Sequence, residues 1–512
     1  MMKDIKIFII LGLLSLGVTS CLDKFPDDAV EQHKAITNID QADEAVIGIY
    51  STFMNSALYS GYLTLLPDIQ SDLVYAVNGY SNQHGAVWRW DIQPTDTEIE
   101  AVYATLYEVI GNCNFFLDNA KKLEVTLTND DDLDYLERLC GEAYFARALA
   151  YSELIKLYCV DYKSDEEAKN ELGVVITDSY YGEKNITRAS LYDSYQFVIA
   201  DIERAAKLLA LGEDYDTAVD GELFNASQYF NEYTAYALRA RIALYMRNWD
   251  DAIKYSTKII ESGYYSLASA TTEYSPGVSY YQYMWEHDMA FEVIWKVGFT
   301  VTNYGGSLGR VFWNFDYSNY YPDYVPAQWV LESFDANDLR DDICFYTVAT
   351  GHSHGLTWPL LYKYYGNVDL YNSAMLLHTS MPKVFRLAEQ YLIRAEAYAR
   401  KAVPDYNKAA KDIAALRTKR YDTSYGGGVS MNEENAMDII EGERVKELYM
   451  EGFRLQDLKR WEKGFERKPQ DQSLEHGSRL KIEADNPLFV WPIPQHEIDA
   501  PGSNIQPNKS NK

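Results

Sequence analysis

Apolar and small side chains recur at helical spacing over residues 382–421, where the pattern is clearest. The stripe repeats every three or four residues on either side of Pro404 and consists of Leu387, Tyr391, Ala395, Tyr398, Tyr406, Ala410, Ile413 and Leu416. Residues three and four apart lie on one face of an α-helix. Small alanines on facing stripes let two helix backbones approach closely while Leu and Tyr side chains interdigitate around them. The segment therefore predicts a helical hairpin that turns at Pro404.

The same spacing predicts further helices. They are expected at about residues 40–56, 66–75, 99–117, 129–158 and 190–209, and residues 436–461 are expected to form one helix or a helix pair. Residues 232–263 read as a second hairpin, with a length close to the 34 residues of a tetratricopeptide repeat. The predicted fold is all-α, a tetratricopeptide-like α/α superhelix of about three or four helix pairs. Its helical repeats are expected at about 130–262 and 382–461.

Residues 270–372 break this pattern. They contain 25 Phe, Trp and Tyr in 103 positions, against 14% aromatic residues in the whole chain. The stretch FWNFDYSNYYPDYVPAQW has little helical period and several Pro and polar breaks. We expect a large irregular aromatic-rich loop insertion, with short strands, inside a single domain that spans residues 39–512.

The N-terminus has the pattern of a lipoprotein signal. Lys3 and Lys6 precede an apolar run at 7–16, which ends in small residues before Cys21. The run is too short to span a bilayer stably. We expect a signal peptide over 1–20, acylation of Cys21 and a lipid tether over 21–38. Two or more acyl chains on Cys21 would suffice for stable anchoring in the membrane. The alternative is an ordinary signal peptide with an incidental Cys21.

The net charge narrows the class of ligand, and the spacing of the cysteines narrows the kind of site that they can form. The formal net charge of -29 argues against nucleic acid and favours neutral ligands. The remaining cysteines show no CxxC and no regular spacing, so we expect buried thiols rather than a disulfide framework or a metal site: Cys113, Cys140, Cys159 and Cys344.

Three segments resemble the SusD/RagB family of surface nutrient-binding lipoproteins. They are RLAEQYLIRAEAY at 386–398, ERVKELYMEGFRLQDLKRW at 443–461 and WPIPQHEID at 491–499, and EAYFARA at 142–148 fits an earlier repeat of the family. The Asn-Pro-Asn run that often follows the third segment is replaced here by APGSN at 500–504. The resemblance implies an outer-membrane, surface-exposed lipoprotein that sits over a SusC-like TonB-dependent transporter. It also implies a ligand site in the variable loops, oligosaccharides or peptides as ligands, and no cofactor.

Aromatic loops that also carry polar side chains are the candidate ligand site, because sugar rings need flat apolar faces together with hydrogen-bonding partners. One set of candidates follows the second helix and comprises Tyr80, Asn82, Trp88 and Trp90; the other lies in the insertion and comprises Trp285, Trp313, Asn314, Tyr320 and Trp329. The resemblance implies a site that combines both regions. For each tryptophan the alternative is core packing. If WRW at 88–90 is a strand, we expect one of Trp88 and Trp90 to face inward and the other to be free.

Catalytic and metal sites are weaker interpretations. Glu447 and Glu451 resemble a carboxylate pair on one helical face, but Arg444 and Arg454 on the same face would keep both ionised, which a general acid cannot be. His352 and His354 lack further ligands at suitable spacing. The acidic run 129–134 lacks the glycine and distal Glu of an EF-hand. We therefore predict a non-enzymatic oligosaccharide-binding lipoprotein. A peptide-binding member of the family is the second hypothesis, and a helical glycoside hydrolase is the third.

Overall fold

The computed structural model describes residues 35–181, 187–210, 227–351, 357–468 and 480–511. The predicted signal peptide, Cys21 and most of the tether lie outside these ranges, as do His352 and His354. Longer helices dominate the first half, and they are α2 (Ile39–Phe53), α3 (Tyr62–Gln70), α5 (Thr97–Glu124), α6 (Asp130–Tyr158), α8 (Leu191–Leu208), α11 (Glu232–Tyr245) and α12 (Trp249–Ile260). The C-terminal part adds α18 (Leu387–Arg400), α19 (Tyr406–Arg420), α20 (Ala436–Glu447), α21 (Arg454–Arg460) and α22 (Gln495–Asp499).

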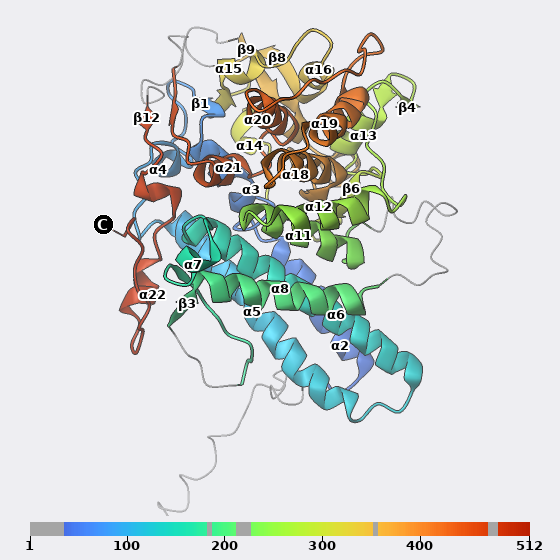
Figure 1. The fold of residues 1–512 in the computed structure, drawn as a ribbon, viewed down its shortest axis with the longest axis vertical. Helices are drawn as coiled ribbons and strands as arrows, with labels where there is room; N and C mark the ends of the chain where they lie inside the picture. Colours follow the sequence, from blue (N-terminus) through green and yellow to red (C-terminus); the bar gives the residue numbers. More distant parts are fainter. Residues whose placement is uncertain (1–34, 182–186, 211–226, 352–356, 469–479, 512) are drawn as a thin grey trace, which may run out of the picture.

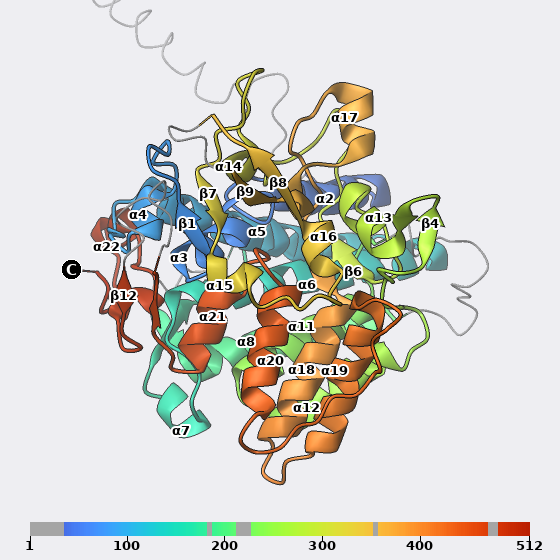
Figure 2. The ribbon, with the colours of Figure 1, turned by 90° about the horizontal axis from the view of Figure 1, so that it is seen from above.

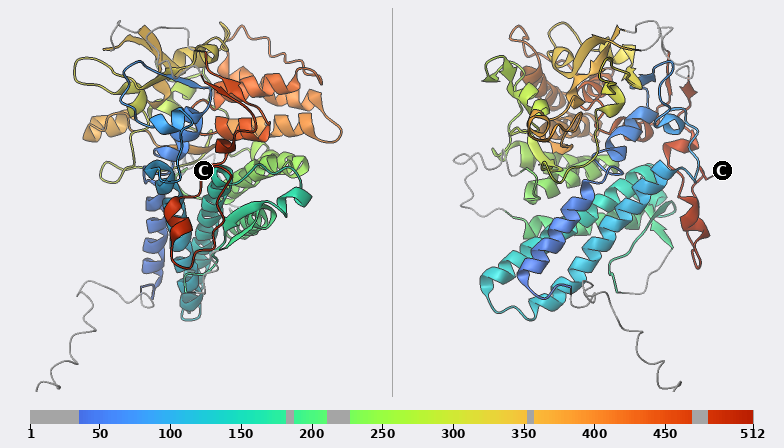
Figure 3. Two further views of the ribbon diagram at one scale, coloured as in Figure 1. Left: turned by 90° about the vertical axis from the view of Figure 1, so that its left-hand side faces the viewer. Right: turned by 180° about the vertical axis from the view of Figure 1, so that it is seen from behind.

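Helices α2, α5, α6 and α8 lie side by side in the lower half of the molecule (Figures 1 and 3). Their starts follow the local sequence, because Asn or Ser at the N-cap satisfies a free backbone N–H. The side chain of Asn38 caps α2, that of Asn129 caps α6 and that of Ser190 caps α8. The acidic residues after Asn129 occupy the first turn of α6, where the helix dipole favours them.

The repeat is made of helix pairs that pack in sequence: α6 with α8, α11 with α12, and α18 with α19, with α12 also packed on α18 (Figure 2). Alanines fill the contacts, including Ala146 in α6, Ala240 in α11 and Ala395 in α18, all fully buried. Helices α6 and α8 approach closely at Gly141 of α6, where an added Cβ would lie 2.8 Å from Cβ of Leu208. The predicted all-α repeat fold and both hairpins are confirmed.

The insertion is built from short elements over the upper part of the molecule (Figure 1). Its helices are α13 (Tyr280–Glu286), α14 (Arg310–Trp313), α15 (Gln328–Leu331), α16 (Arg340–Cys344), η2 (Tyr362–Tyr364) and α17 (Val368–Ala374). Its strands are β4 (Glu273–Ser275), β5 (Val278–Ser279), β6 (Val293–Lys296), β7 (Tyr324–Pro326), β8 (Phe345–Ala349) and β9 (Thr357–Leu361). The antiparallel hairpin of β8 and β9 pairs Phe345 with Leu361 and Ala349 with Thr357. These are the irregular loops and short strands that the aromatic composition predicts.

Two antiparallel pairs join the insertion to the rest of the chain. Strand β7 pairs with β1 (Val74–Ala76), and β6 pairs with β10 (Lys383–Arg386), which leads directly into α18. The other small elements are α4 (Gly85–Trp88), α7 (Asp165–Ala168), β2 (Leu172–Val175), β3 (Arg188–Ser190), β11 (Phe465–Glu466), β12 (Lys481–Ile482) and η4 (Pro487–Phe489).

The segment 66–93 differs from the prediction. The expected helix at 66–75 lies earlier, at 62–70, and the chain then enters strand β1. WRW is not a strand, because α4 ends at Trp88 and Trp90 has a φ of 58°, in the left-handed region. Both indoles are buried, Trp88 completely. Alternation in such a short apolar run does not distinguish a strand from a helix end.

Helix α20 ends at Glu447, so Glu447 and Glu451 do not lie on one helical face as predicted. Met450 and Gly452 both have positive φ and turn the chain toward α21. Arg444 pairs with Asp457, and Arg454 pairs with Asp72 and Glu441. The arginines named from sequence are therefore not the partners of this carboxylate pair.

A buried network of ion pairs, which we call the arginine network, surrounds these carboxylates instead. Arg386 contacts Glu292, Glu447 and Glu451 at 2.7–2.9 Å. Further members are Arg420, which contacts Glu292 and Glu447, and Arg340, which contacts Asp338, Glu443 and Glu447. Burial raises the pKa of Glu447, but the charges of Arg420, Arg386 and Arg340 outweigh it and hold that pKa well below its usual range. The pair remains ionised, as predicted, through other arginines.

No helix in the described ranges is long and apolar enough to cross a membrane. Cys113, Cys140, Cys159 and Cys344 are free thiols, of which Cys140 is partly exposed and the others are buried. Within the same ranges no cluster of three or more His, Cys, Asp or Glu is arranged to hold a metal ion.

Candidate ligand-binding site

The insertion surrounds a hollow of about 510 Å³, which we call the aromatic hollow. It is lined by Gln282, Trp313, Tyr320, Asp342, Ile343, Phe345, Tyr346, Val348, Tyr362 and Tyr365. These residues come from α13, α14, the loop between α14 and β7, α16, strand β8 and the turn around η2, so distant parts of the insertion converge on one surface. The volume lies within the usual range for small-ligand sites.

Trp313 forms the buried side of the aromatic hollow. It is 1% exposed, and its Nε1 donates to the carbonyl oxygen of Leu361 at 2.6 Å, which fixes the plane of the indole. The rings of Tyr320 and Tyr365 meet it nearly at right angles, with centroids 5.4 and 5.0 Å away. Edge-to-face contacts of this kind are favourable and directional. Trp313 therefore orients two tyrosine rings, of which Tyr320 is half-buried and Tyr365 is exposed to solvent.

The tyrosines form the accessible wall. Tyr365 is 39% exposed and Tyr346 is 60% exposed, which is high for rings of this size in a folded protein. Tyr362 and Tyr365 stack with centroids 5.1 Å apart and planes only 15° from parallel. Tyr346 extends this group, with its ring centroid 6.1 Å from that of Tyr362. Together they offer apolar ring surface beside phenolic hydroxyls.

Polar groups in the hollow are few and carry little charge. Among the described residues of the lining, Asp342 is the only charged one, and Gln282 donates from Nε2 to Glu286 at 2.8 Å. Burial and a hydrogen bond with Tyr320 raise the pKa of Tyr365 to about 12. Its hydroxyl is therefore protonated at neutral pH and can donate as well as accept a hydrogen bond. The surface suits a neutral ligand with both apolar faces and hydroxyl groups.

Of the nine candidate ligand-binding residues, Trp313 and Tyr320 line the hollow, and Asn314 is exposed beside them at the end of α14. Trp285 is buried, with the cationic groups of Lys363, Lys383 and Arg386 over its ring. Trp329 is half-buried and donates to the carbonyl oxygen of Asp72. Trp285 and Trp329 therefore do not line the aromatic hollow.

The candidates after the second helix lie apart from the hollow lining. Trp88 belongs to the core and contacts the rings of Tyr80 and Tyr324 edge-on or tilted. Tyr80 and Asn82 both accept hydrogen bonds from Nη1 of Arg89. The structure does not bring these three residues to the hollow lining, so a site that combines both regions remains a prediction.

Sequence reasoning missed Gln282, Tyr346, Tyr362 and Tyr365. The run YKYY at 362–365 was the available signal, because it is a dense tyrosine cluster inside the aromatic insertion. Tryptophans were favoured over tyrosines, yet an indole is large enough that the core usually takes it.

Two family models match the chain: one described as the SusD family over residues 348–509, and one described as starch-binding associating with outer membrane over residues 21–244. Together they cover about three quarters of its length. The chain belongs to the SusD family. Among curated relatives, it is 21% identical to SusD-like protein P25 of Formosa agariphila, over 90% of each chain. SusD-like protein P2 of the same species is 22% identical over 99% of each chain.

Solved SusD structures share the fold. A SusD superfamily protein from Bacteroides thetaiotaomicron matches with a TM-score of 0.76 and 25% identity, over 92% of this chain and 99% of that one. A SusD-like carbohydrate binding protein from Bacteroides vulgatus matches with a TM-score of 0.67 and 19% identity, over 88% of this chain and 89% of that one.

Proposed function

We propose that this SusD-family protein binds oligosaccharides in the aromatic hollow. The observation that carries the proposal is the wall of Tyr346, Tyr362 and Tyr365, held in place by a buried Trp313. Aromatic faces pack against the C–H faces of sugar rings, and the phenolic hydroxyls, Gln282 and Asp342 serve sugar hydroxyls. The family description of starch binding and the carbohydrate-binding relative from Bacteroides vulgatus support the same ligand class.

The proposal includes delivery rather than turnover. The protein is held at the outer-membrane surface by lipid on Cys21 and passes its ligand to a SusC-like TonB-dependent transporter. The description of the family as associating with the outer membrane supports this location. The burial of Glu447 and Glu451, the carboxylate pair considered for hydrolysis, argues against catalysis by this pair. Their side chains are 0% and 5% exposed and are enclosed by arginines. A substrate cannot reach them.

The first experiment is affinity gel electrophoresis of the protein without residues 1–21, through a panel of neutral and acidic polysaccharides. We expect retardation by at least one neutral glycan. Tyr365→Ala and Tyr346→Ala should each weaken binding of its oligosaccharide by about 1–3 kcal/mol in calorimetry, because each removes an aromatic face. Both rings are exposed, so the thermal unfolding midpoint should change little.

Tyr135→Ala is the matched control, since Tyr135 is 41% exposed on α6, outside the hollow. Retardation that survives both hollow variants would place the glycan elsewhere. If no polysaccharide retards the protein, and if it binds peptides that the hollow variants no longer bind, then peptides rather than oligosaccharides are the ligands of the aromatic hollow.

A further inference from the structure

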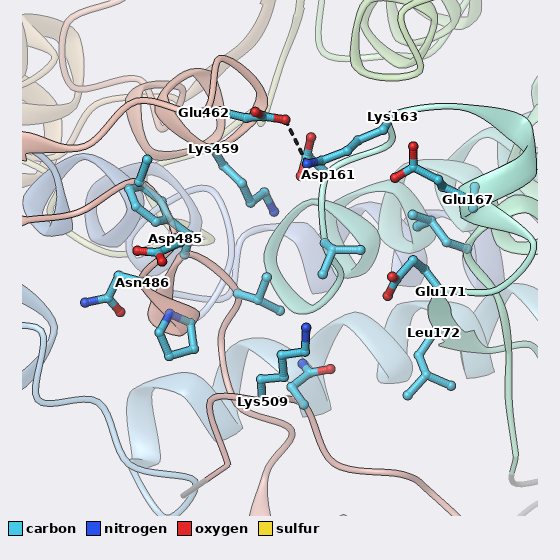
Figure 4. Close-up of a pocket in the computed structure, with 18 of the residues that line it drawn as sticks. Asp161, Lys163, Glu167, Glu171, Leu172, Lys459, Glu462, Asp485, Asn486 and Lys509 are labelled. Atoms are coloured by element: carbon cyan, nitrogen blue, oxygen red, sulfur yellow. Dashed lines mark ion pairs between the residues drawn. The ribbon is translucent and has the colours of Figure 1, made fainter.

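A second hollow, which we call the charged hollow, lies at the side of the molecule near the C-terminus. Its volume is about 560 Å³, and no residue lines both it and the aromatic hollow. It forms where the segment after α6, helix α7, the start of α8, the end of α21 and the segments after β12 meet (Figure 4). Its apolar lining includes Val160, Ala168, Leu172, Leu191, Phe489 and Val490.

A buried ammonium group faces this space. Lys459 is 7% exposed, and its Nζ donates to the carbonyl oxygens of Lys156 at 2.5 Å and Cys159 at 3.0 Å. These carbonyls belong to the C-terminal end of α6, where a cation is favourable. Lys459 forms no ion pair with any carboxylate in the described ranges, and an ammonium has a third N–H to donate. The charge of Asp161, which pairs with Arg247, acts on Lys459 without an ion pair between them, so a carboxylate entering the hollow would supply a direct counter-ion.

Lys509 approaches the same space from the opposite wall, and Figure 4 shows the two lysines pointing toward one another. Lys509 is exposed and forms no hydrogen bond or ion pair through its side chain with the described residues. Lys163, by contrast, is already paired with Glu462 at 2.8 Å. The two unpaired cations therefore define one end of a binding surface for a carboxylate.

Carboxylates of the protein flank the lysines. Glu171 lies on one side and Asp485 on the other, and neither side chain has a hydrogen bond or ion pair within the described part of the chain (Figure 4). Opposite charges thus share a hollow in which Lys163 pairs with Glu462 and Asp161 pairs with Arg247, while Glu171 and Asp485 form no ion pair with the described residues. An unpaired carboxylate beside an apolar floor suits an ammonium group.

We propose that the charged hollow binds a small zwitterion, a molecule with a carboxylate and an ammonium group joined by an apolar body. Its carboxylate lies between Lys459 and Lys509, its ammonium group lies at Glu171, and its carbon chain covers the apolar lining. This site is independent of oligosaccharide binding in the aromatic hollow.

The test uses ω-amino acids from three to eight carbons as probes, titrated into the protein lacking residues 1–21. Each is compared with the carboxylic acid and the primary amine of the same chain length. We expect at least one amino acid to bind at least tenfold more tightly than both single-charge counterparts. The proposal is overturned if no amino acid exceeds them, or if an acid or amine alone binds equally well.

Variants assign the site. Lys509→Gln should weaken the best probe at least fivefold, and Glu171→Gln should weaken the amino acid while leaving the matched acid unchanged. Neither side chain has a partner to lose among the described residues, so both variants should fold. Lys481→Gln, whose side chain is 65% exposed and paired with Glu483, is the control, and Tyr365→Ala should bind the probe normally. Loss of probe binding in Tyr365→Ala would instead place the zwitterion in the aromatic hollow and overturn the assignment.

Discussion

Trp88 and Trp313 have the same side chain and equally buried positions but different neighbours. The indole of Trp88 is enclosed by Tyr80, Tyr324 and the guanidinium of Arg467, 5.1 Å from its ring. Trp313 is enclosed on one side and contacts the tyrosine rings of the aromatic hollow on the other. Burial alone therefore does not decide whether a tryptophan serves a site; the neighbours that it orients do.

Trp88→Ala should lower the free energy of unfolding by about 3–5 kcal/mol, because it leaves a large cavity in the core. We expect the affinity of the folded protein for its oligosaccharide to be unchanged. Urea unfolding and calorimetry on the same preparation measure the two quantities. A weaker affinity with normal stability would show that Trp88 contacts ligand.

At the scale of elements, the helix pairs depend on small residues at fixed contacts. Gly141 of α6 faces Leu208 and Leu209, whereas Gly111 of α5 has no atom within 4 Å of the position that a Cβ would occupy. Both glycines lie inside long helices, so their intrinsic cost to helix stability is similar. They differ only in what surrounds them.

Gly111→Ala should stabilise the protein by about 0.5–1 kcal/mol, the usual gain of helix propensity. Gly141→Ala should instead destabilise it by about 1–3 kcal/mol, because the new methyl group collides with α8 and overpacks the contact. Equilibrium unfolding of the two variants side by side checks the pair. Equal stabilisation of the two variants would mean that α6 and α8 can move apart without lowering the free energy of unfolding.

The sequence predicts the elements of the repeat better than those of the insertion. Alanine stripes and N-caps at Asn129 and Ser190 are local features, so they locate α6 and α8 closely. The wall of the aromatic hollow depends on contacts between residues far apart in the chain, such as Tyr320 with Trp313 and Tyr346 with Tyr362. No local period encodes those contacts. The partners of Glu447 were missed for the same reason, since Arg340 and Arg386 come from other segments.

At the scale of the molecule, the arginine network joins the repeat to the insertion. Glu443 is one of its members: burial raises its pKa, but the charges of Arg340, Lys446 and Arg417 outweigh burial and lower that pKa to about 2. An acid with a depressed pKa in the folded state contributes stability above its unfolded pKa of about 4.5. That stability is lost as the pH falls from about 4.5 to about 2.

Glu443→Gln should destabilise the protein at pH 7 by about 3–5 kcal/mol, because buried arginines lose a counter-ion. Its unfolding free energy should then fall less steeply than that of the natural protein between pH 4.5 and pH 2. Urea unfolding at pH 7, 4.5 and 3 measures both effects. Glu433→Gln, at an exposed position, is the control, and an unchanged acid slope in Glu443→Gln would contradict the assignment.

The arginine network and the lining of the aromatic hollow have no residue in common. Arg340 anchors the segment that carries Asp342 and Tyr346, and Lys363, which pairs with Glu451, anchors the segment that carries Tyr362 and Tyr365. The side chains that would meet a ligand are thus free to vary while their anchors stay fixed. Substitutions in the lining can therefore change which sugar is recognised while the buried ion pairs that hold the fold stay unchanged. A library that randomises only the lining of the aromatic hollow should retain folded members.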